Sequence, residues 1–254
     1  MSDWLFNNEN HYIQSKLLLD NGFSHAFFTK KTSQRSPEKL IDIFSSDHEI
    51  FRLKQIHSNI AKFTRDINTK EYLKADALIS ENSRKQSLWI YTADCIPILL
   101  ADINTGRVAA CHAGWRGISQ NIINNLMRKL KEDGTKTKDL IIAIGPAISC
   151  LSYEVNKITA SKINRGIKLS ATKTFALTTL ESLDIIKIEK STNKIFLDIR
   201  IAASIQLQKE GLKTSQISIN SNCTFKEDSL FHSWRRDKFR ASQWSVILSK
   251  ENYS

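Results

Sequence analysis

Two histidines and one cysteine are the residues of this sequence best suited to bind a metal ion. They are His57, Cys95 and His112, each placed beside small or turn-forming residues. Imidazole and thiolate groups suit Zn²⁺, and three of them leave a fourth tetrahedral position open for water or substrate. A closed structural zinc site would usually contain cysteine pairs at short spacing, which this chain lacks. The pattern therefore indicates an enzyme.

Each of these residues also has a simpler interpretation. A free cysteine is more often a small core residue than a ligand, and a single histidine is commonly a hydrogen-bonded core or surface residue. Cys111 and His112 are neighbours on a probable strand, so one should face the core and the other a site at the strand end. Asp94, beside Cys95, suits a general base, a partner that orients a histidine, or a turn. Asp76 suits a turn or a contact to substrate.

Three arginines are candidates for binding an anion. Arg116 follows His112 in a glycine-containing turn, and Arg235 and Arg236 stand together near the C-terminus. A guanidinium presents a fork of donors that matches phosphate or carboxylate. The alternatives are a surface ion pair for Arg116 and a solvated basic turn for the other two.

Composition narrows the class of protein. The chain has 254 residues and a net charge of +11, yet its lysines are spread along it and no DNA- or RNA-binding signature is seen. We therefore predict no specific nucleic-acid partner. No signal peptide or membrane-spanning run is apparent, and four cysteines without close pairing suit intracellular thiols. We expect a cytoplasmic protein without a membrane partner; the oligomeric state is not predicted.

Short apolar runs alternate with helical patterns, which favours an α/β or α+β layered fold. One helix is expected from the stripe Ile118, Ile122, Leu126 and Leu130, ending near Gly134. A second is expected after Asp198 and ends at Gly211, and a third is expected from Tyr153 to about Ile163. The residues of the second helix expected to turn inward are Ile201, Ile205, Leu207 and Leu212. The predicted buried strands are 77–79, 88–91, 96–101, 108–111, 140–144 and 217–219.

The order of these residues resembles the laccase-domain family, long labelled multicopper polyphenol oxidase and associated with purine nucleoside phosphorylase activity. The resemblance runs from about residue 23 to 248, and its most specific part is the pair Ala-Asp-Cys-x-Pro and His-Ala-Gly-Trp-Arg-Gly. The matching segments are 55–57, 75–79, 92–97, 112–117, 144–148, 153–155, 223–224 and 233–237.

The resemblance implies an α+β fold, a layered α/β/β/α-type sandwich of mixed sheets with flanking helices, as a single domain over residues 1–254. It implies a mononuclear zinc, with copper as the less favoured metal, held by His57, Cys95 and His112. The implied activities are phosphorolysis of adenosine, inosine, guanosine and methylthioadenosine, and deamination of adenosine, so purine nucleosides and phosphate are the expected partners. The expected catalytic residues are Asp94, Cys95 and His112, and the expected substrate contacts are Lys30, Gln55, Asp76, Arg116, Arg235 and Arg236.

The chain departs from the family pattern in two places. Lys30 stands where many relatives carry an arginine before a Gly-Gly turn, which keeps the charge but loses the bidentate fork. The Gly-Arg-Gln expected near the end appears as residues 239–243, Phe-Arg-Ala-Ser-Gln. Both differences bear on substrate range and turnover.

Four other functions are weighed. Copper-dependent phenol oxidation would need more histidine ligands than the six scattered here. A cysteine hydrolase would use Cys95 as nucleophile and His112 as base. A basic metal-binding interaction protein is the non-catalytic alternative. Editing of misincorporated amino acids in the cell wall, suggested for some relatives, is the fourth.

Overall fold

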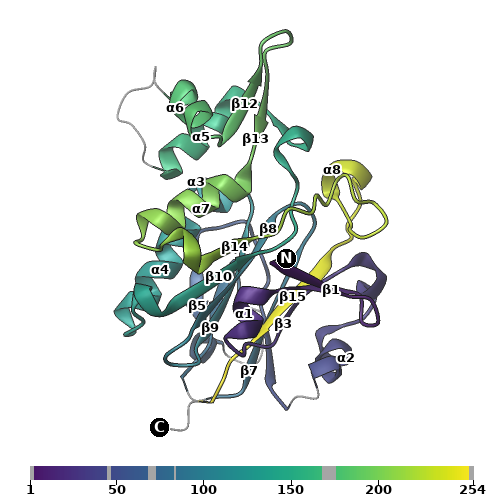
Figure 1. The fold of residues 1–254 in the computed structure, drawn as a ribbon, viewed down its shortest axis with the longest axis vertical. Helices are drawn as coiled ribbons and strands as arrows, with labels where there is room; N and C mark the ends of the chain where they lie inside the picture. The colour runs from purple at the N-terminus through teal and green to yellow at the C-terminus, as the bar shows by residue number, and fades with distance from the viewer. Residues whose placement is uncertain (1–2, 45–46, 68–72, 83, 168–175, 252–254) are drawn as a thin grey trace.

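Two six-stranded sheets are stacked face to face in the computed structural model, which describes residues 3–44, 47–67, 73–82, 84–167 and 176–251. In the first sheet the C-terminal strand lies beside an N-terminal one, as the yellow and purple ribbons of Figure 1 show. The strand order of this sheet is β1 (Trp4–Asn7), β2 (Tyr12–Ser15), β3 (His25–Phe28), β15 (Gln243–Leu248), β7 (Gln86–Thr92) and β4 (Glu49–Arg52).

The second sheet holds five of the six strands expected from apolar runs, and the sixth, 88–91, lies within β7 of the first sheet. Strands β6, β10 and β14 have the expected bounds, and β8 and β9 extend one or two residues further. The strand order of this sheet is β14 (Ile217–Ile219), β10 (Leu140–Ile144), β8 (Ile96–Asp102), β9 (Val108–Ala113), β6 (Ala77–Ile79) and β5 (Ala61–Phe63).

Alternation along β9 explains how the layers are held together. Val108 and Ala110 pack into the core between the two sheets, whereas Ala109 and Cys111 pack into the core beneath the helices. Successive side chains of a strand point to opposite faces, so one strand supplies both cores. The expected divergence of Cys111 and His112 is confirmed, because Cys111 belongs to the helical core and His112 lies at the strand end.

Helices cover the outer faces of both sheets, so the predicted α/β/β/α sandwich is confirmed (Figure 1). Four of them pack on the second sheet: α3 (Trp115–Ser119), α4 (Ile122–Glu132), α5 (Lys157–Ile167) and α7 (Ile199–Lys209). The short α2 (Pro37–Leu40) covers the first sheet. A three-stranded sheet, β11 (Glu154–Val155), β13 (Lys194–Leu197) and β12 (Ile186–Glu189), projects beside α5 and α6 (Ala176–Ser182).

Short elements complete the described chain. The remaining helices are α1 (Lys16–Asp20) and α8 (Trp234–Asp237). Single 3₁₀ turns are found at η1 (Lys30–Thr32), η2 (Ile41–Phe44), η3 (Thr64–Asp66), η4 (Thr137–Asp139), η5 (Cys150–Ser152) and η7 (Thr214–Gln216). No helix within the described ranges is long and apolar enough to span a membrane.

Two of the expected helices need correction. The stripe from Ile118 to Leu130 is split, because Asn121 adopts a left-handed φ of 66° between α3 and α4. All four stripe positions are nevertheless buried, so the apolar period predicts burial correctly and misses the break. The helix expected to start at Tyr153 begins at Lys157, because residues 154–155 pair with β13 as strand β11.

The helix after Asp198 has the predicted ends. The Asp198 carboxylate accepts hydrogen bonds from the backbone N–H groups of Arg200 and Ile201, and Gly211 follows the helix with a φ of 98°. Leu207 and Leu212 are buried as expected, whereas Ile201 and Ile205 are only partly buried and Ala202 and Ala203 are fully buried instead. Close packing of α7 on the sheet accounts for this choice of face.

His25 on β3 makes the stability of the fold dependent on pH. Its Nε2 accepts from the Ser15 N–H at 2.8 Å and its Nδ1 donates to the Phe23 carbonyl at 2.9 Å, so the buried ring is neutral. Burial lowers the pKa of His25 from 6.5 to about 4, against the opposing effect of the Phe23 hydrogen bond.

Between pH 6.5 and about pH 4, the His25 imidazole binds a proton in the unfolded chain but not in the folded protein. The contribution of neutral His25 to stability is therefore fully present above pH 6.5 and is lost as the pH falls towards 4. We expect His25 to account for a loss of about 3 kcal/mol in the free energy of unfolding. Urea unfolding near neutral pH and near the lower pKa measures it, and the His25→Gln variant is the control. An equal pH dependence in that variant would contradict the assignment.

Candidate metal centre and substrate cavity

The side chains of His57, Cys95 and His112 converge at one end of the two stacked sheets. Their ligand atoms all lie within 4.8 Å of one another. The two imidazole rings are nearly perpendicular, with an interplanar angle of 88° and centroids 4.8 Å apart. His112 is buried, Cys95 partly buried and His57 exposed, so the group opens towards solvent on one side.

The two ligands that precede β9 lie in connections where the chain passes from the first sheet to the second. His57 lies between β4 and β5, and Cys95 ends the turn between β7 and β8. Left-handed backbone occurs in both connections, with a φ of 57° at His57 and 84° at Asp94. Such conformations cost on the order of 1–3 kcal/mol each and persist where surrounding contacts hold them.

Asp76 supplies the contacts that hold the histidines in place. Its Oδ1 accepts from the Nδ1 of His112 at 2.9 Å and from the backbone N–H of His57 at 3.0 Å. Its Oδ2 accepts from the Ser58 hydroxyl at 2.6 Å, and hydrogen bonds from His112 and Ser58 lower the pKa of Asp76 despite its burial. The carboxylate fixes the His112 ring so that Nε2 faces the other ligands.

Asp76 is also an expected substrate contact, but the structure places it away from the cavity wall. The Asp76 side chain is 0% exposed and does not line the cavity into which the metal ligands open. Its carboxylate lies behind the histidines, where it orients a ligand.

The local chemistry fits a metal ion. Burial alone would raise the pKa of Cys95, but the imidazoles of His112 and His57 lower it to about 6. Burial likewise opposes protonation of His112, whereas Cys95 and Asp76 raise the pKa of His112 to about 9. Gly114 leaves room for the ligands, because a Cβ there would lie 2.7 Å from the Cys95 Sγ. One thiolate and two imidazoles form the nitrogen and sulfur set that Zn²⁺ prefers.

A cavity of about 960 Å³ surrounds the metal ligands. Its wall combines aromatic and cationic side chains, and Asp94 is the one acidic residue among the described residues that line it. The aromatic residues are Tyr91, Trp115, Tyr153 and Trp234, and the cationic ones are Lys54, Arg116, Arg235, Lys238 and Arg240. A concave site with this lining suits a ligand that has both a flat ring system and negative charge.

Arg116 and Arg235, two of the three arginines that the sequence offers as candidates for binding an anion, both lie on this wall. The Arg116 guanidinium lies over the Trp115 ring at 4.7 Å from its centroid. The Arg235 guanidinium lies 4.9 Å from the Tyr153 ring centroid and donates one hydrogen bond of 3.0 Å to the Glu154 carbonyl. Each guanidinium therefore rests on an aromatic ring and keeps further N–H groups for a ligand.

Asp94 ties the metal-bearing turn to helix α8. Its Oδ1 accepts from the Thr224 hydroxyl at 2.7 Å, and its Oδ2 accepts from the backbone N–H of Arg235 at 2.6 Å. Asp94 is 8% exposed. Because both oxygens are engaged, this carboxylate positions Arg235 beside the metal ligands, and the geometry favours that role over that of a general base.

Gln55 also lies on the cavity wall with its amide engaged. Its Nε2 donates to the Tyr91 carbonyl at 2.8 Å, and its Oε1 accepts from the Tyr91 N–H at 2.9 Å. The side chain thereby extends the edge of β7 and holds the connection that carries His57.

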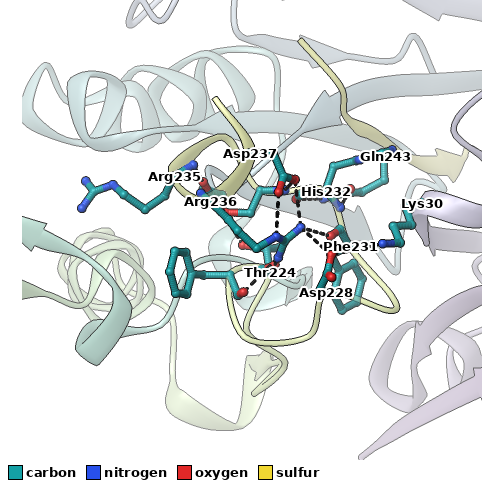
Figure 2. Close-up of polar contacts among 12 residues, drawn as sticks. Lys30, Thr224, Asp228, Phe231, His232, Arg235, Arg236, Asp237 and Gln243 are labelled. Carbon is teal, nitrogen blue, oxygen red and sulfur yellow. Dashed lines mark hydrogen bonds and ion pairs between the residues drawn. The ribbon is translucent and has the colours of Figure 1, made fainter. Parts of the chain in front are cut away.

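Arg236 and Lys30, both expected as substrate contacts, are not among the residues that line the cavity. Figure 2 shows the Arg236 guanidinium pointing into the loop of residues 224–231, while the Arg235 side chain extends in another direction. Arg236 donates to the carbonyls of Thr224, Phe225 and Phe231 and pairs with Asp228 and Asp237. Lys30 pairs with Asp228 at 3.2 Å.

Replacing Arg236 by alanine should destabilise the protein by about 3 kcal/mol, because several carbonyls lose a charged donor. Lys30→Ala should change the free energy of unfolding by less than about 1 kcal/mol, since its ion pair is exposed. Urea unfolding of both variants measures the difference. A destabilisation by Arg236→Ala no greater than that by Lys30→Ala would contradict this account.

Several cavity residues escape prediction from sequence. Lys54 and Lys238 line the wall, but each stands just outside a segment that matches the family, and Arg240 stands in the segment 239–243, which departs from the family pattern. Lys54 directly precedes the matching segment 55–57, which is the signal that the sequence offers for it. Tyr153 and Trp234 lie inside the segments 153–155 and 233–237 that match the family.

Comparisons with known proteins place this geometry in a family. Residues 30–250 match the family model described as multi-copper polyphenol oxidoreductase laccase. A purine nucleoside phosphorylase of Synechocystis sp. is 32% identical over 260 residues, covering 97% of this chain and 96% of that protein. The purine nucleoside phosphorylase YlmD of Bacillus subtilis is 29% identical over 227 residues, covering 85% of this chain and 77% of that protein.

Solved structures agree on the fold. YlmD from Geobacillus stearothermophilus superimposes with a TM-score of 0.81 at 20% identity, covering 99% of this chain and all of that one. The hypothetical protein YfiH from Bacillus licheniformis gives a TM-score of 0.78 at 22% identity, covering 96% and 98% of the two chains. The family model matches residues 30–250 of this chain, and a relative that aligns over nearly the whole chain is 32% identical. The chain therefore belongs to the multi-copper polyphenol oxidoreductase laccase family.

Proposed function

We propose that this protein is a zinc-dependent purine nucleoside phosphorylase. It would convert adenosine, inosine, guanosine and methylthioadenosine, with phosphate, into the free base and ribose 1-phosphate, and would also deaminate adenosine. The observation that carries the proposal is a three-ligand metal group that opens on a cavity with two guanidinium groups and aromatic walls. The names of the two relatives described above support it.

The cavity offers separate surfaces for the two substrates. Trp115 and Tyr153 present ring faces suited to a purine, which is flat and apolar on both faces. Arg116 and Arg235 present guanidinium donors suited to phosphate. Because each arginine lies over one of these rings, a phosphate on the arginines and a purine on the rings would be neighbours.

Phosphorolysis needs these two substrates held in line. A phosphate oxygen forms a bond to C1′ of the ribose while the bond from C1′ to the purine nitrogen breaks and its electron pair moves to the base. Arg116 and Arg235 would orient the phosphate and offset its charge near the sugar. When bound by His57, Cys95 and His112, Zn²⁺ would supply Lewis acidity and lower the pKa of water in its fourth position, which suits deamination.

A cysteine hydrolase is a second candidate, favoured by one specific observation. Cys95 contacts His112, and Asp76 orients the His112 ring, which is the arrangement of a nucleophile, a base and an orienting carboxylate. His57 favours the metal reading, since it approaches the same thiolate from the open side and a triad does not need it.

The test follows hypoxanthine released from inosine by chromatography, with and without phosphate, using metal-stripped and zinc-restored protein. We expect product only with phosphate and metal together. Phosphate-independent hydrolysis that survives stripping would point to the cysteine hydrolase, and phenol oxidation after copper loading would point to the family's descriptive name. No product from inosine or adenosine at stoichiometric zinc would overturn the proposal.

Arg235→Ala should raise the KM for phosphate by about 10- to 100-fold, because a hydrogen bond to a charged group contributes about 1.5–3 kcal/mol. The hydrogen bond from the backbone N–H of residue 235 to the Asp94 carboxylate is kept in this variant. Arg128→Ala is the matched control, because Arg128 is exposed on α4 and pairs with Glu132. Initial rates at varied phosphate measure the effect, and an unchanged KM in Arg235→Ala would rule out this contact.

We place the reaction in the cytoplasm. All four cysteines are free thiols, and Cys95 must stay reduced to bind a metal ion.

A further inference from the structure

A second cavity, of about 510 Å³, lies between helices α3 and α5 beside the metal cavity. Trp115 and Arg116 line both cavities. The remaining lining residues of the second are all polar or cationic: Ser119, Gln120, Asn121, Lys162 and Arg165. No acidic side chain among the described residues lines it, so its chemistry is that of an anion site.

The base of this groove is fixed by close helix packing. A Cβ at Gly166 of α5 would lie 2.5 Å from the Ile118 carbonyl of α3, so the two helices touch through backbone. The Gln206 Nε2 of α7 donates to the carbonyls of Ile118 and Gly166, both at 2.9 Å. This buried amide holds α3 and α5 together, and the side chains above are presented at a set spacing.

Three cations line the groove without carboxylate partners among the described residues. The Arg116 Cζ and the Lys162 Nζ lie 4.7 Å and 5.6 Å from the centroid of the same Trp115 ring. Arg165 follows Lys162 by three positions on α5, so both are presented on one side of that helix. By contrast, Arg128 and Lys131 on the neighbouring α4 each pair with a glutamate.

Helix α4 adds further positive potential. Its N-cap residue, Asn121, lines the groove, and the Asn121 side chain makes no capping hydrogen bond. The first turn of this 11-residue helix contains no acidic residue. An uncapped helix N-terminus favours an anion.

We propose that the groove between α3 and α5 binds a diphosphate group, either free pyrophosphate or the phosphate chain of a nucleotide. Three unpaired cations can offset the several charges of two linked phosphates, and the cavity has room for more than one phosphate group. Arg116 belongs to both cavities, so a diphosphate here draws on a guanidinium that the metal cavity also uses. The predicted weakening of phosphate binding in the metal cavity rests on the proposed phosphorylase function, whereas diphosphate binding itself does not.

Isothermal titration calorimetry with pyrophosphate as probe tests the site. The experiment uses zinc-loaded wild type, and also Cys95→Ala protein so that pyrophosphate bound to metal is excluded. We expect K162A/R165A to weaken pyrophosphate binding at least 10-fold in both backgrounds. The control K136A/K138A removes the same charge from exposed lysines elsewhere and should bind as wild type does. Equal affinity in K162A/R165A and wild type, or an equal loss in the control, would overturn the proposal.

Two further arms identify the source of the diphosphate and its effect. If ATP binds more tightly than pyrophosphate, the groove is assigned to a nucleotide. If the two bind with equal affinity, the groove is assigned to the diphosphate group alone. Binding of adenosine without binding of ATP or pyrophosphate would contradict the site. In the activity assay, pyrophosphate should raise the KM for phosphate in wild type and not in K162A/R165A, whose rate without pyrophosphate should be unchanged. If the protein shows no phosphorolysis, the calorimetric arm still decides whether the groove binds diphosphate.

Discussion

The Cys95→Ala variant should lose its metal ion and at least about 10³-fold of its phosphorolysis rate. Removing the thiolate leaves two imidazoles, and the Lewis acidity of a bound metal contributes several kcal/mol to catalysis. Metal content after gel filtration and initial rates with inosine and phosphate measure the two losses. Stoichiometric metal together with wild-type turnover in this variant would show that Cys95 is not a ligand.

Cys111→Ala is the matched control for that experiment. Cys111 adjoins His112 on β9 but faces the helical core, and burial raises the pKa of its thiol, so it stays protonated. We expect this variant to keep its metal and activity and to lose about 1 kcal/mol of stability. The two cysteines therefore separate loss of a ligand from loss of packing at the same end of the sheet.

Asp76→Asn should weaken metal binding by about 10- to 100-fold, the usual effect of removing a carboxylate that orients a metal-binding histidine. The amide cannot accept every hydrogen bond that His112, the His57 backbone and Ser58 now donate. Competition with a chromophoric chelator measures the dissociation constant of the metal.

A general cost of removing a buried charge must be separated from this effect. Asp102→Asn provides the comparison, because Asp102 is 1% exposed at the far end of β8 and its carboxylate accepts hydrogen bonds from the backbone N–H groups of Asn104 and Thr105. Both variants should be less stable than wild type, but Asp102→Asn should bind metal normally. A metal affinity in Asp76→Asn that matches wild type would remove Asp76 from the site.

Most strands of the second sheet were predictable from sequence because their burial is continuous, whereas β3 (His25–Phe28) of the first sheet is buried throughout and was not predicted. Strands such as Leu140–Ile144 are buried at every position and appear as apolar runs. Strands β1 and β4 lie at the two edges of the first sheet with little burial, and their four-residue lengths leave no clear period. The break at Asn121 was equally hidden, because the apolar spacing continues through it while the backbone turns.

Some residues of the candidate site were likewise predictable from sequence, and others were not. His57, Cys95 and His112 were expected together from the family resemblance, and the structure brings them within one group. Which of two adjacent arginines faces the cavity was not predictable, since successive residues of a helical turn point about 100° apart. Arg235 faces the cavity and Arg236 the loop, and only the tertiary partners of α8 decide between them.

Both passages of the chain from the first sheet to the second contribute a ligand, and this has a consequence for the order of folding events. His57 and Cys95 come together with His112 only after each sheet has formed and the two have stacked. Long-range contacts of this kind form late, since loop closure must precede them. We therefore expect metal binding to be the final step of folding, so that a new chain binds its ion only after both sheets have formed and stacked.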